Sequence, residues 1–331
     1  MASGDLSRWY VSKSFESAID TVATLNLSFL GTFTFNPKNK EQIDKNVNGT
    51  PYEQSIVRTG LMGELTISGD ATCNLVEPMF KDVMQARPTT TGAGDPYSHT
   101  HTDEASGSPA TGGMGTAGAT VTAGAQVAGI ANYIDRIAGV TATQLTLSGT
   151  GEGIVQVSTS FETSGTVAAT TEPSVTLPTE GYLMGNKTTL SVGGSDVSTR
   201  IVDYSVTFNN GFNYVPRAGS TTGSGVSIDR ENKRPFIEFT YTLVEGAVNE
   251  AGGHDDWPAK TQRAIILVLK GDTNRDVTIT LKNCQIQDGY PIKTNESGVY
   301  KVQRKVRALY NSGTTPKWYS VVVRNDVAAY T

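Results

Sequence analysis

Residues 264–310 are the most regular part of this chain, and they read as short strands separated by tight turns. The stretch holds an apolar run at 265–269, then VTITL at 277–281 and KVQRKVR at 301–307, with Gly- and Asn-bearing turns between them. Short runs of β-branched and apolar residues bounded by such turns are typical of β-strands. Almost no helical period appears, so the sequence predicts a mainly β protein.

The same alternation of apolar and polar residues recurs in both halves of the chain. In segment 21–35 it is interrupted at Gly31, where we expect a β-bulge. The residues predicted to share a buried face are Leu25, Leu27, Phe29, Phe33 and Phe35 in that segment, and Val202, Tyr204, Val206 and Phe208 further on. The composition agrees, because 35 glycines and only 18% charged residues suit short strands joined by turns rather than a coiled coil.

One short segment carries a clear helical period. Four apolar residues, three and four positions apart, form one face: Met79, Phe80, Val83 and Met84. Pro78 suits a first helical position and Pro88 a stop, so we expect a short helix between them. A weaker helical pattern lies at 130–137.

Residues 88–127 are mostly Gly, Ala, Ser and Thr, with hardly any large apolar side chain. Alone in water such a segment buries too little surface to offset an ordering cost of about 1–2 kcal/mol per residue. We therefore expect neighbouring copies of the chain to order it. Pro88, Tyr97 and Val127 are the candidates for these contacts.

The chain divides into two predicted β-units, 1–165 and 166–331, each large enough to bury a core. Near the end of each half the order strand, Gly-bearing turn, strand appears, first as a hairpin at 144–161. The stretch 164–180 reads as a linker. The likeness of the halves leaves two interpretations open, a duplicated unit and a chance similarity of pattern.

His99, His101 and Asp103 form the one cluster that resembles a set of metal ligands. Two imidazoles at i and i+2 on an extended segment lie on the same side and can share a cation. The Gly-rich surroundings offer no rigid scaffold, however, so we favour a packed or solvated polar loop. His254 lies in a turn-like loop, and no Ser or Cys motif supplies a nucleophile. The sequence predicts no catalytic residue, no cofactor and no resident metal.

A basic stripe lies near the end of the chain. On a strand, Lys301, Lys305 and Arg307 share one face. The two interpretations are a nucleic acid-binding stripe and an exposed strand face that pairs with carboxylates across the sheet or on a neighbouring subunit. The net charge of −5 gives no general attraction to phosphate, and no aromatic residue is interleaved on this face, so we favour the second.

The sequence shows no sign of export or membrane insertion. Cys73 and Cys284 match no metal or redox spacing and are expected to be buried thiols. The N-terminal residues lack the cationic and apolar regions of a signal peptide. The longest apolar run, 265–269, is far shorter than the ~20 residues that span a bilayer. We expect a soluble chain made in a cytoplasm.

Several segments occur in an order shared with a known family. The second half has a strand that enters an Asn-Asn turn, then an aromatic-rich strand, a long apolar strand and the closing strands, at 204–220, 234–243, 264–272 and 277–310; the first half matches more loosely at 63–86 and 139–162. In this order the chain resembles the tail tube proteins of long-tailed, siphovirus-like bacteriophages.

The resemblance implies a β-sandwich or half-barrel with a short flanking helix. It implies a structural virion protein of the phage tail, not an enzyme, assembled in the host cytoplasm. Copies would join edge to edge into rings, three per ring if the chain is duplicated and six otherwise, and rings would stack into a hollow tube that delivers DNA.

Tape measure, tail terminator and distal tail proteins are the further partners that the resemblance implies, with DNA only as passing cargo. An acidic or neutral channel lets DNA pass, so we expect Lys301, Lys305 and Arg307 to point into subunit contacts. The alternatives are an extracellular β-sandwich adhesion module and the inner tube of a contractile tail or secretion-like injection system.

Overall fold

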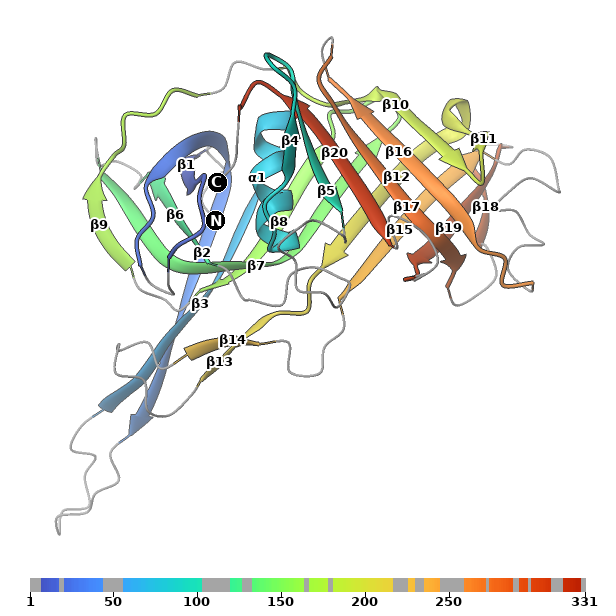
Figure 1. Ribbon diagram of the computed structural model, residues 1–331. Coiled ribbons are helices and arrows are strands. Elements are labelled where there is room, and N and C mark those ends of the chain that lie inside the picture. The colour runs from blue at the N-terminus through green and yellow to red at the C-terminus, as the bar shows by residue number, and fades with distance from the viewer. Residues whose placement is uncertain are drawn as a thin grey trace.

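The structure, a computed structural model, describes residues 7–17, 21–43, 56–102, 120–126, 133–163, 167–177, 181–216, 226–229, 235–244, 259–271, 274–287, 292–296, 299–310 and 318–328. It is an elongated β-protein with one α-helix in these residues (Figure 1). The elements of the first half are β1 (Ser7–Ser12), β2 (Leu25–Ile43), β3 (Ile56–Asp70), α1 (Cys73–Met84), β4 (Thr89–Thr91), β5 (Tyr97–Thr102), β6 (Val121–Gln126), β7 (Tyr133–Thr150), β8 (Gln156–Thr163) and β9 (Val167–Thr171).

The second half contains β10 (Met184–Val192), β11 (Ser195–Asp196), a 3₁₀ turn (Ser198–Arg200), β12 (Ile201–Asn209), β13 (Asn213–Pro216), β14 (Val226–Asp229), β15 (Phe236–Val244), β16 (Arg263–Lys270), β17 (Asp276–Ile286), β18 (Ile292–Glu296), β19 (Val299–Ala308) and β20 (Tyr319–Asn325). All strands except β13 and β14 belong to one hydrogen-bonded sheet. The prediction of a mainly β fold with one short helix is confirmed.

The first half closes into a barrel. β1 pairs with β2, β2 with β3, β3 with β8, β8 with β7 and β7 with β6, and β6 returns to β1. Every one of these pairings is antiparallel. Closure pairs most of the strand edges within this half and leaves the interior for apolar side chains. Trp9, Phe29, Leu65 and Phe161 are all buried there.

The second half is two packed layers. One layer runs β12–β15–β19–β18, and the other runs β10–β16–β17–β20 and continues into β5 and β4 of the first half. The layers join where residues 284–286 at the end of β17 pair with β19. β12 also pairs with β7, so the sheet runs without interruption from one half into the other.

Helix α1 is buried along its whole length, between the sheet and the β5–β20 layer. Thr72 caps it, since its hydroxyl accepts a hydrogen bond from the Leu75 N–H, and Gln85 ends it in a left-handed conformation. The helix therefore begins at Cys73, and the prediction that it begins at Pro78 is wrong. The capping threonine was the better start signal in the sequence.

Two further expectations about local structure need correction. The prediction of a weak helix at 130–137 is wrong, because Tyr133 begins strand β7, which pairs on one side with β6 and on the other with β9. Gly31 is no bulge, because the pairing register is regular there. It is glycine because a Cβ would lie only 2.5 Å from the Ser68 carbonyl oxygen.

The predicted linker at 164–180 contains β9, which pairs with β7. The Gly-rich segment 88–127 contains β4, β5 and β6. β5 pairs with β20, and β6 pairs with β1 and β7. The described part of that segment is thus paired with strands of its own chain.

Candidate assembly surfaces

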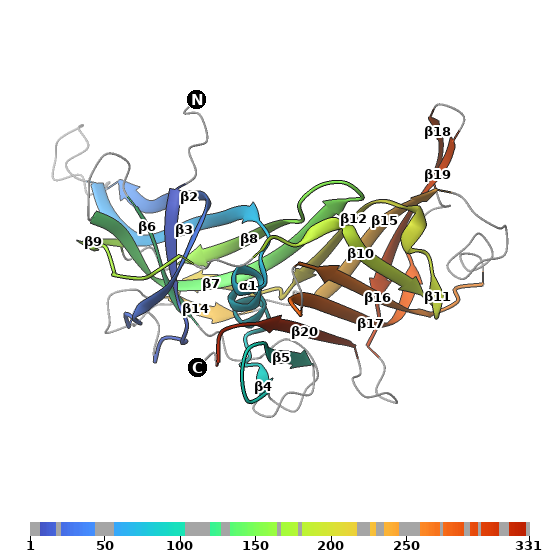
Figure 2. The same ribbon diagram turned by 90° about the horizontal axis from the view of Figure 1, so that it is seen from above.

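Eight strands form a continuous sheet with one covered and one uncovered face. Their order is β2–β3–β8–β7–β12–β15–β19–β18. Figure 2 shows α1, β5 and β20 on one side of this sheet. Period-two alternation sends the large apolar side chains to that side and small polar side chains to the other. We call the second side the uncovered face.

The uncovered face is made chiefly of hydroxyl and amide side chains. One row crosses seven strands in register: Thr32, Ser68, Ser158, Thr146, Thr207, Glu238 and Arg307. Thr146 and Thr207 join the two halves through a 3.1 Å hydroxyl–hydroxyl bond. Short polar side chains expose little apolar surface, so this face does not form a hydrophobic core with another layer.

The charges on the uncovered face are mixed. The described acidic residues on it are Glu64, Asp70, Glu162, Asp203 and Glu238, and the basic ones are Lys301, Lys305 and Arg307. Lys305 Nζ lies 2.8 Å from Glu238 Oε1 on the adjacent strand. The Arg307 guanidinium stacks 4.7 Å from the centroid of the Phe236 ring. The predicted alternation of the basic strand is therefore present, and at least part of its charge is paired across the sheet.

Both ends of the eight-stranded sheet have an open edge in the described residues. β1 covers β2 only as far as Gly31, and residues 32–43 of β2 pair with β3 alone. At the opposite end β18 pairs only with β19. An unpaired strand edge presents N–H and C=O groups to whatever strand approaches it.

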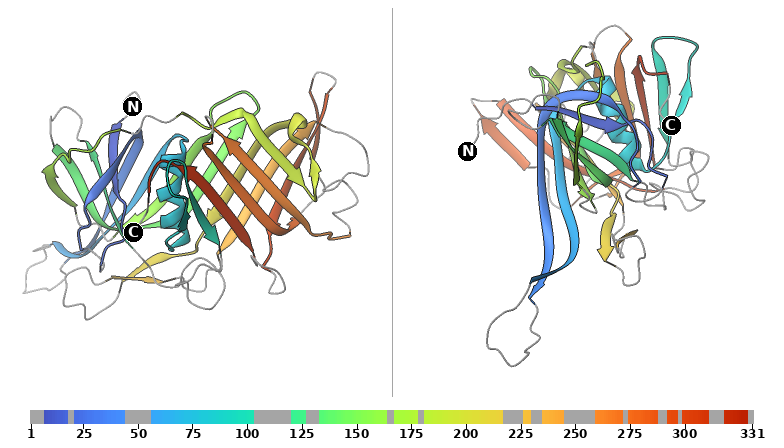
Figure 3. Two further views of the ribbon diagram at one scale, coloured as in Figure 1. Left: turned by 45° about the horizontal axis from the view of Figure 1, so that its top comes forward. Right: turned by 90° about the vertical axis from the view of Figure 1, so that its left-hand side faces the viewer.

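The far parts of β2 and β3 form an arm that leaves the body of the molecule (Figure 1). The two strands stay paired from Asn36 and Glu64 out to Ile43 and Ile56. The short β13–β14 hairpin projects in the same direction (Figure 3). An isolated two-stranded ribbon is marginally stable in water, so an arm of this length calls for a partner surface.

The seam between the halves is tight. Gly149 on β7 lies directly opposite Tyr204 on β12, and a Cβ at Gly149 would be 2.5 Å from the tyrosine hydroxyl oxygen. Gly185 donates its backbone N–H to the Gly153 carbonyl at 2.7 Å, and a Cβ there would overlap the Thr150 carbonyl oxygen. Gly149 therefore leaves room for the Tyr204 side chain, and Gly185 allows two backbone segments to approach closely.

The two histidines of the candidate metal cluster are buried structural residues. His99 bonds Thr90 through Nδ1 and Asn325 through Nε2, both at 2.9 Å. His101 Nε2 lies 2.9 Å from Glu77 Oε1 on α1. Asp103 lies outside the described residues, and within them no group of His, Cys, Asp and Glu is arranged to hold a metal ion.

A buried ion pair lies one turn further along α1. Lys81 Nζ donates to the Lys13 carbonyl at 2.8 Å and lies 3.3 Å from Asp82 Oδ1. Burial raises the pKa of Asp82 to about 6, despite the lowering effect of Lys81. Apart from Lys81, no group in the described part of the chain donates a hydrogen bond to the Asp82 carboxylate.

The other predicted contact residues are placed as follows. Pro88 is half-buried after α1, and Tyr97 lies on β5 opposite Asn325 of the same chain. Val127 lies outside the described residues, as does His254. Cys73 and Cys284 are buried free thiols, as expected, and burial raises the pKa of Cys284 to about 12.

Glu16 is a buried carboxylate that the sequence analysis did not identify. Glu16 accepts hydrogen bonds at 2.7 Å from the hydroxyls of Thr120 and Thr122, and it also accepts from the Gly139 N–H. It thereby fixes the start of β6 onto the barrel. An isolated Glu gives no sequence signal for such a role. β9 was missed because its five residues, VAATT, are all small or β-branched, with no alternation.

No helix in the described residues is long and apolar enough to cross a membrane. No curated protein matches the chain in sequence. The family model for phage tail tube proteins matches residues 10–243. The match covers the barrel from Tyr10 of β1 onward and the second half as far as β15, and it stops before the closing strands at 264–310. More than half of the chain is covered, so the protein belongs to the phage tail tube family and is a structural component of the virion tail.

Proposed function

We propose that three copies of this chain close head to tail into each ring of the tail tube, and that the rings, assembled in the host cytoplasm, stack into the channel for DNA. The observation that carries this proposal is a strand order that occurs twice in the eight-stranded sheet. β2–β3–β8–β7 in the first half is matched by β12–β15–β19–β18 in the second. In each set the last two strands lie in the sheet in the reverse of their order along the chain, as β8–β7 and as β19–β18.

The pairings behind this sheet repeat as well. The long strand β7 corresponds to β17 at its start and to β18 at its end. With this correspondence, β1–β6 matches β10–β16, β6–β7 matches β16–β17, and β7–β9 matches β17–β20. All are antiparallel. One β-unit present twice accounts for every correspondence. On this division β9 belongs to the first unit, so we put the boundary between the units after Thr171 rather than between residues 165 and 166.

The junction inside the chain supports the ring. β7 of the first unit pairs with β12, the opening strand of the second. In the correspondence between the units, β18 is the counterpart of the end of β7, and β2 is the counterpart of β12. If the β7–β12 junction is repeated between copies, β18 of one copy therefore pairs with β2 of the next. These are the two open edges of the sheet. A head-to-tail contact that repeats and closes gives a ring, and three copies supply six units.

In such a ring the uncovered face lines the channel. Its hydroxyl and amide side chains, with five acidic and three basic residues among the described side chains, retain DNA weakly, because each Lys or Arg that neutralises a phosphate adds salt-dependent affinity. In this proposal Lys301, Lys305 and Arg307 face the channel, whereas the expectation from sequence was that they point into subunit contacts. The Lys305–Glu238 pair reduces the charge that DNA meets.

The β2–β3 arm is suited to tie one ring to the next, because it projects well beyond the body that would form the ring (Figure 3). Tape measure, tail terminator and distal tail proteins are the partners proposed for the ends of the finished tube.

Electron microscopy and mass measurement of the purified full chain test the ring. We expect rings with threefold symmetry, pseudo-sixfold in outline, and a particle mass of three times 35.2 kDa. A ring of six chains, or a protein that remains monomeric at every concentration, would overturn the proposal.

Shortening the arm separates ring closure from stacking. A variant in which Lys38 is joined to Met62, its partner in the β2–β3 ladder, by a two-residue turn removes only the outer arm. We expect it to form rings that no longer stack into tubes. Normal tubes from this variant would show that the arm does not join rings.

A further inference from the structure

β9 has an open edge on the outside of the molecule. It pairs with β7 along Tyr133–Ile137, and no strand pairs with its other side in the described residues. Ala168, Ala169 and Thr171 are exposed. Figure 1 shows β9 at one end of the molecule and β18 at the other.

This edge lacks the features that normally keep strand edges apart. Soluble proteins protect exposed edges with Lys, Pro, an inward-pointing charge or a bulge. The sequence of β9, VAATT, has no charge and no proline, and its pairing with β7 is regular. Its small side chains leave the backbone accessible to an incoming strand.

The counterpart of β9 in the second unit is already covered. β20 pairs with β17 as β9 pairs with β7. The other edge of β20 is covered by β5, with Tyr97–Thr102 running antiparallel to Ser320–Asn325. β5 comes from the first unit. At the seam inside the chain, the first unit therefore covers the edge strand of the second.

We propose that the outer edge of β9 is a docking site for a second copy of this chain, whose second unit covers β9 as β5 covers β20. The inference rests on the proposed ring, since it applies the internal seam to the contact between copies. The β2 edge and the β9 edge belong to the same unit, so one neighbouring copy reaches both. In the first unit, the segment that contains the covering strand β5 lies between β3 and β6 in the chain. The segment at the same place in the second unit, between β15 and β16, is 245–262.

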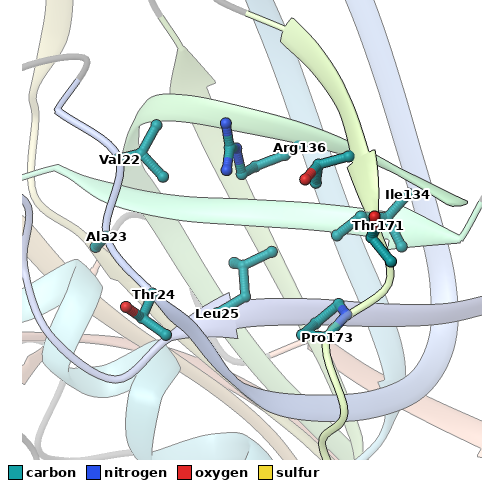
Figure 4. Close-up of a pocket in the computed structure, with 9 residues that line it drawn as sticks. Val22, Ala23, Thr24, Leu25, Ile134, Arg136, Thr171 and Pro173 are labelled. Carbon is teal, nitrogen blue, oxygen red and sulfur yellow. The ribbon is translucent and has the colours of Figure 1, made fainter.

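A hollow of about 250 Å³ lies beside β9 and adds a recognition feature (Figure 4). Val22, Leu25, Ile134 and Pro173 give it apolar walls, and Arg136 brings a guanidinium to it. The Arg136 side chain has no hydrogen-bond or ion-pair partner among the described residues. In the sequence, 245–262 carries four carboxylates, at Glu245, Glu250, Asp255 and Asp256, which matches a cationic hollow on the facing copy.

Hydrogen exchange of the full chain, compared between dissociated subunits and assembled tubes, tests the docking site. We expect the β9 amides to become at least tenfold better protected on assembly. β20 is the internal control, because β5 covers it in the single chain and its protection should change little. Protection gained at β2 and β18 but not at β9 would refute the docking site and leave the ring intact. No gain at β2 or β18 would refute the ring itself.

Substitution gives a second test. Ala169→Lys places a charge on the exposed edge of β9, and Thr66→Lys places the same charge on the uncovered face of β3. We expect Ala169→Lys to raise the concentration needed for assembly at least tenfold, with the thermal stability of the subunit unchanged, whereas Thr66→Lys assembles normally. Unimpaired assembly of Ala169→Lys, or equal impairment of both variants, would overturn the proposal.

Discussion

Phe208 is the residue through which the two halves share a core. Its buried ring meets Phe80 of α1 edge to face at 5.2 Å, and it meets Tyr319 of β20 in the same way at 6.3 Å. Phe80 belongs to the first half, and the other two belong to the second. Phe208→Ala removes both contacts and leaves a cavity, which costs about 3–5 kcal/mol at a fully buried site. That is a large part of the 5–15 kcal/mol that typically stabilises a native protein.

Urea denaturation of dissociated subunits, monitored by hydrogen exchange of the β1 and β20 amides, measures whether both halves lose this free energy of unfolding. We expect the urea midpoints reported by β1 and by β20 to fall together, because the lost contacts support both sides of the seam. Phe208→Leu is the control, since it keeps most of the buried volume and should cost markedly less. A variant in which β20 loses protection while β1 keeps the wild-type midpoint would show that the halves are separate cores.

Three further substitutions test local features. Burial raises the folded-state pKa of Asp82 from 3.8 to about 6, so the folded protein binds this proton more tightly than the unfolded chain does. The contribution of Asp82 to stability should therefore rise by up to about 3 kcal/mol as pH falls from 7 towards 4. Asp82→Asn should lack this contribution, so the stability difference between wild type and variant in urea titrations should change with pH, and a difference that stays constant would contradict the assignment. Gly185→Ala should destabilise the subunit by about 1–3 kcal/mol, because its Cβ overlaps the Thr150 carbonyl, whereas Gly94→Ala, with no atom within 4 Å, should be nearly neutral in the same assay. Thr72→Ala should cost about 1 kcal/mol through loss of the α1 cap, Thr72→Ser should restore most of it, and equal midpoints for all three proteins would rule out the cap.

The strands that sequence predicted well are those with one buried and one polar face. β12 is the example, because Tyr204, Val206 and Phe208 face the core and the residues between them lie on the uncovered face. β7 was misread at its start because Ile134 and Ile137 are both buried although they point to opposite sides of the strand. A three-residue spacing of this kind has the same appearance as a helix turn. Pairing with β6 and β9, which the local sequence does not encode, decides the outcome.

The polar residues inside the molecule were the hardest to predict. Glu77, Lys81 and Asp82 have the composition of an exposed helix face, yet all three are buried against strands distant in the sequence. The same holds for His99 and His101, whose partners come from β4, β20 and α1. The open edges could be anticipated only in general terms. Which strands remain unpaired depends on the order of all the others.

The two units that meet at the β7–β12 pairing belong to one polypeptide, and this has a thermodynamic consequence for a threefold ring. Half of the junctions around the circle are formed when the polypeptide folds, so closing the circle takes two bimolecular encounters instead of five. Each encounter avoided saves the loss of translational and rotational freedom, of the order of 4–15 kcal/mol at the 1 M standard state. Weak contacts at the remaining junctions then suffice at a given subunit concentration.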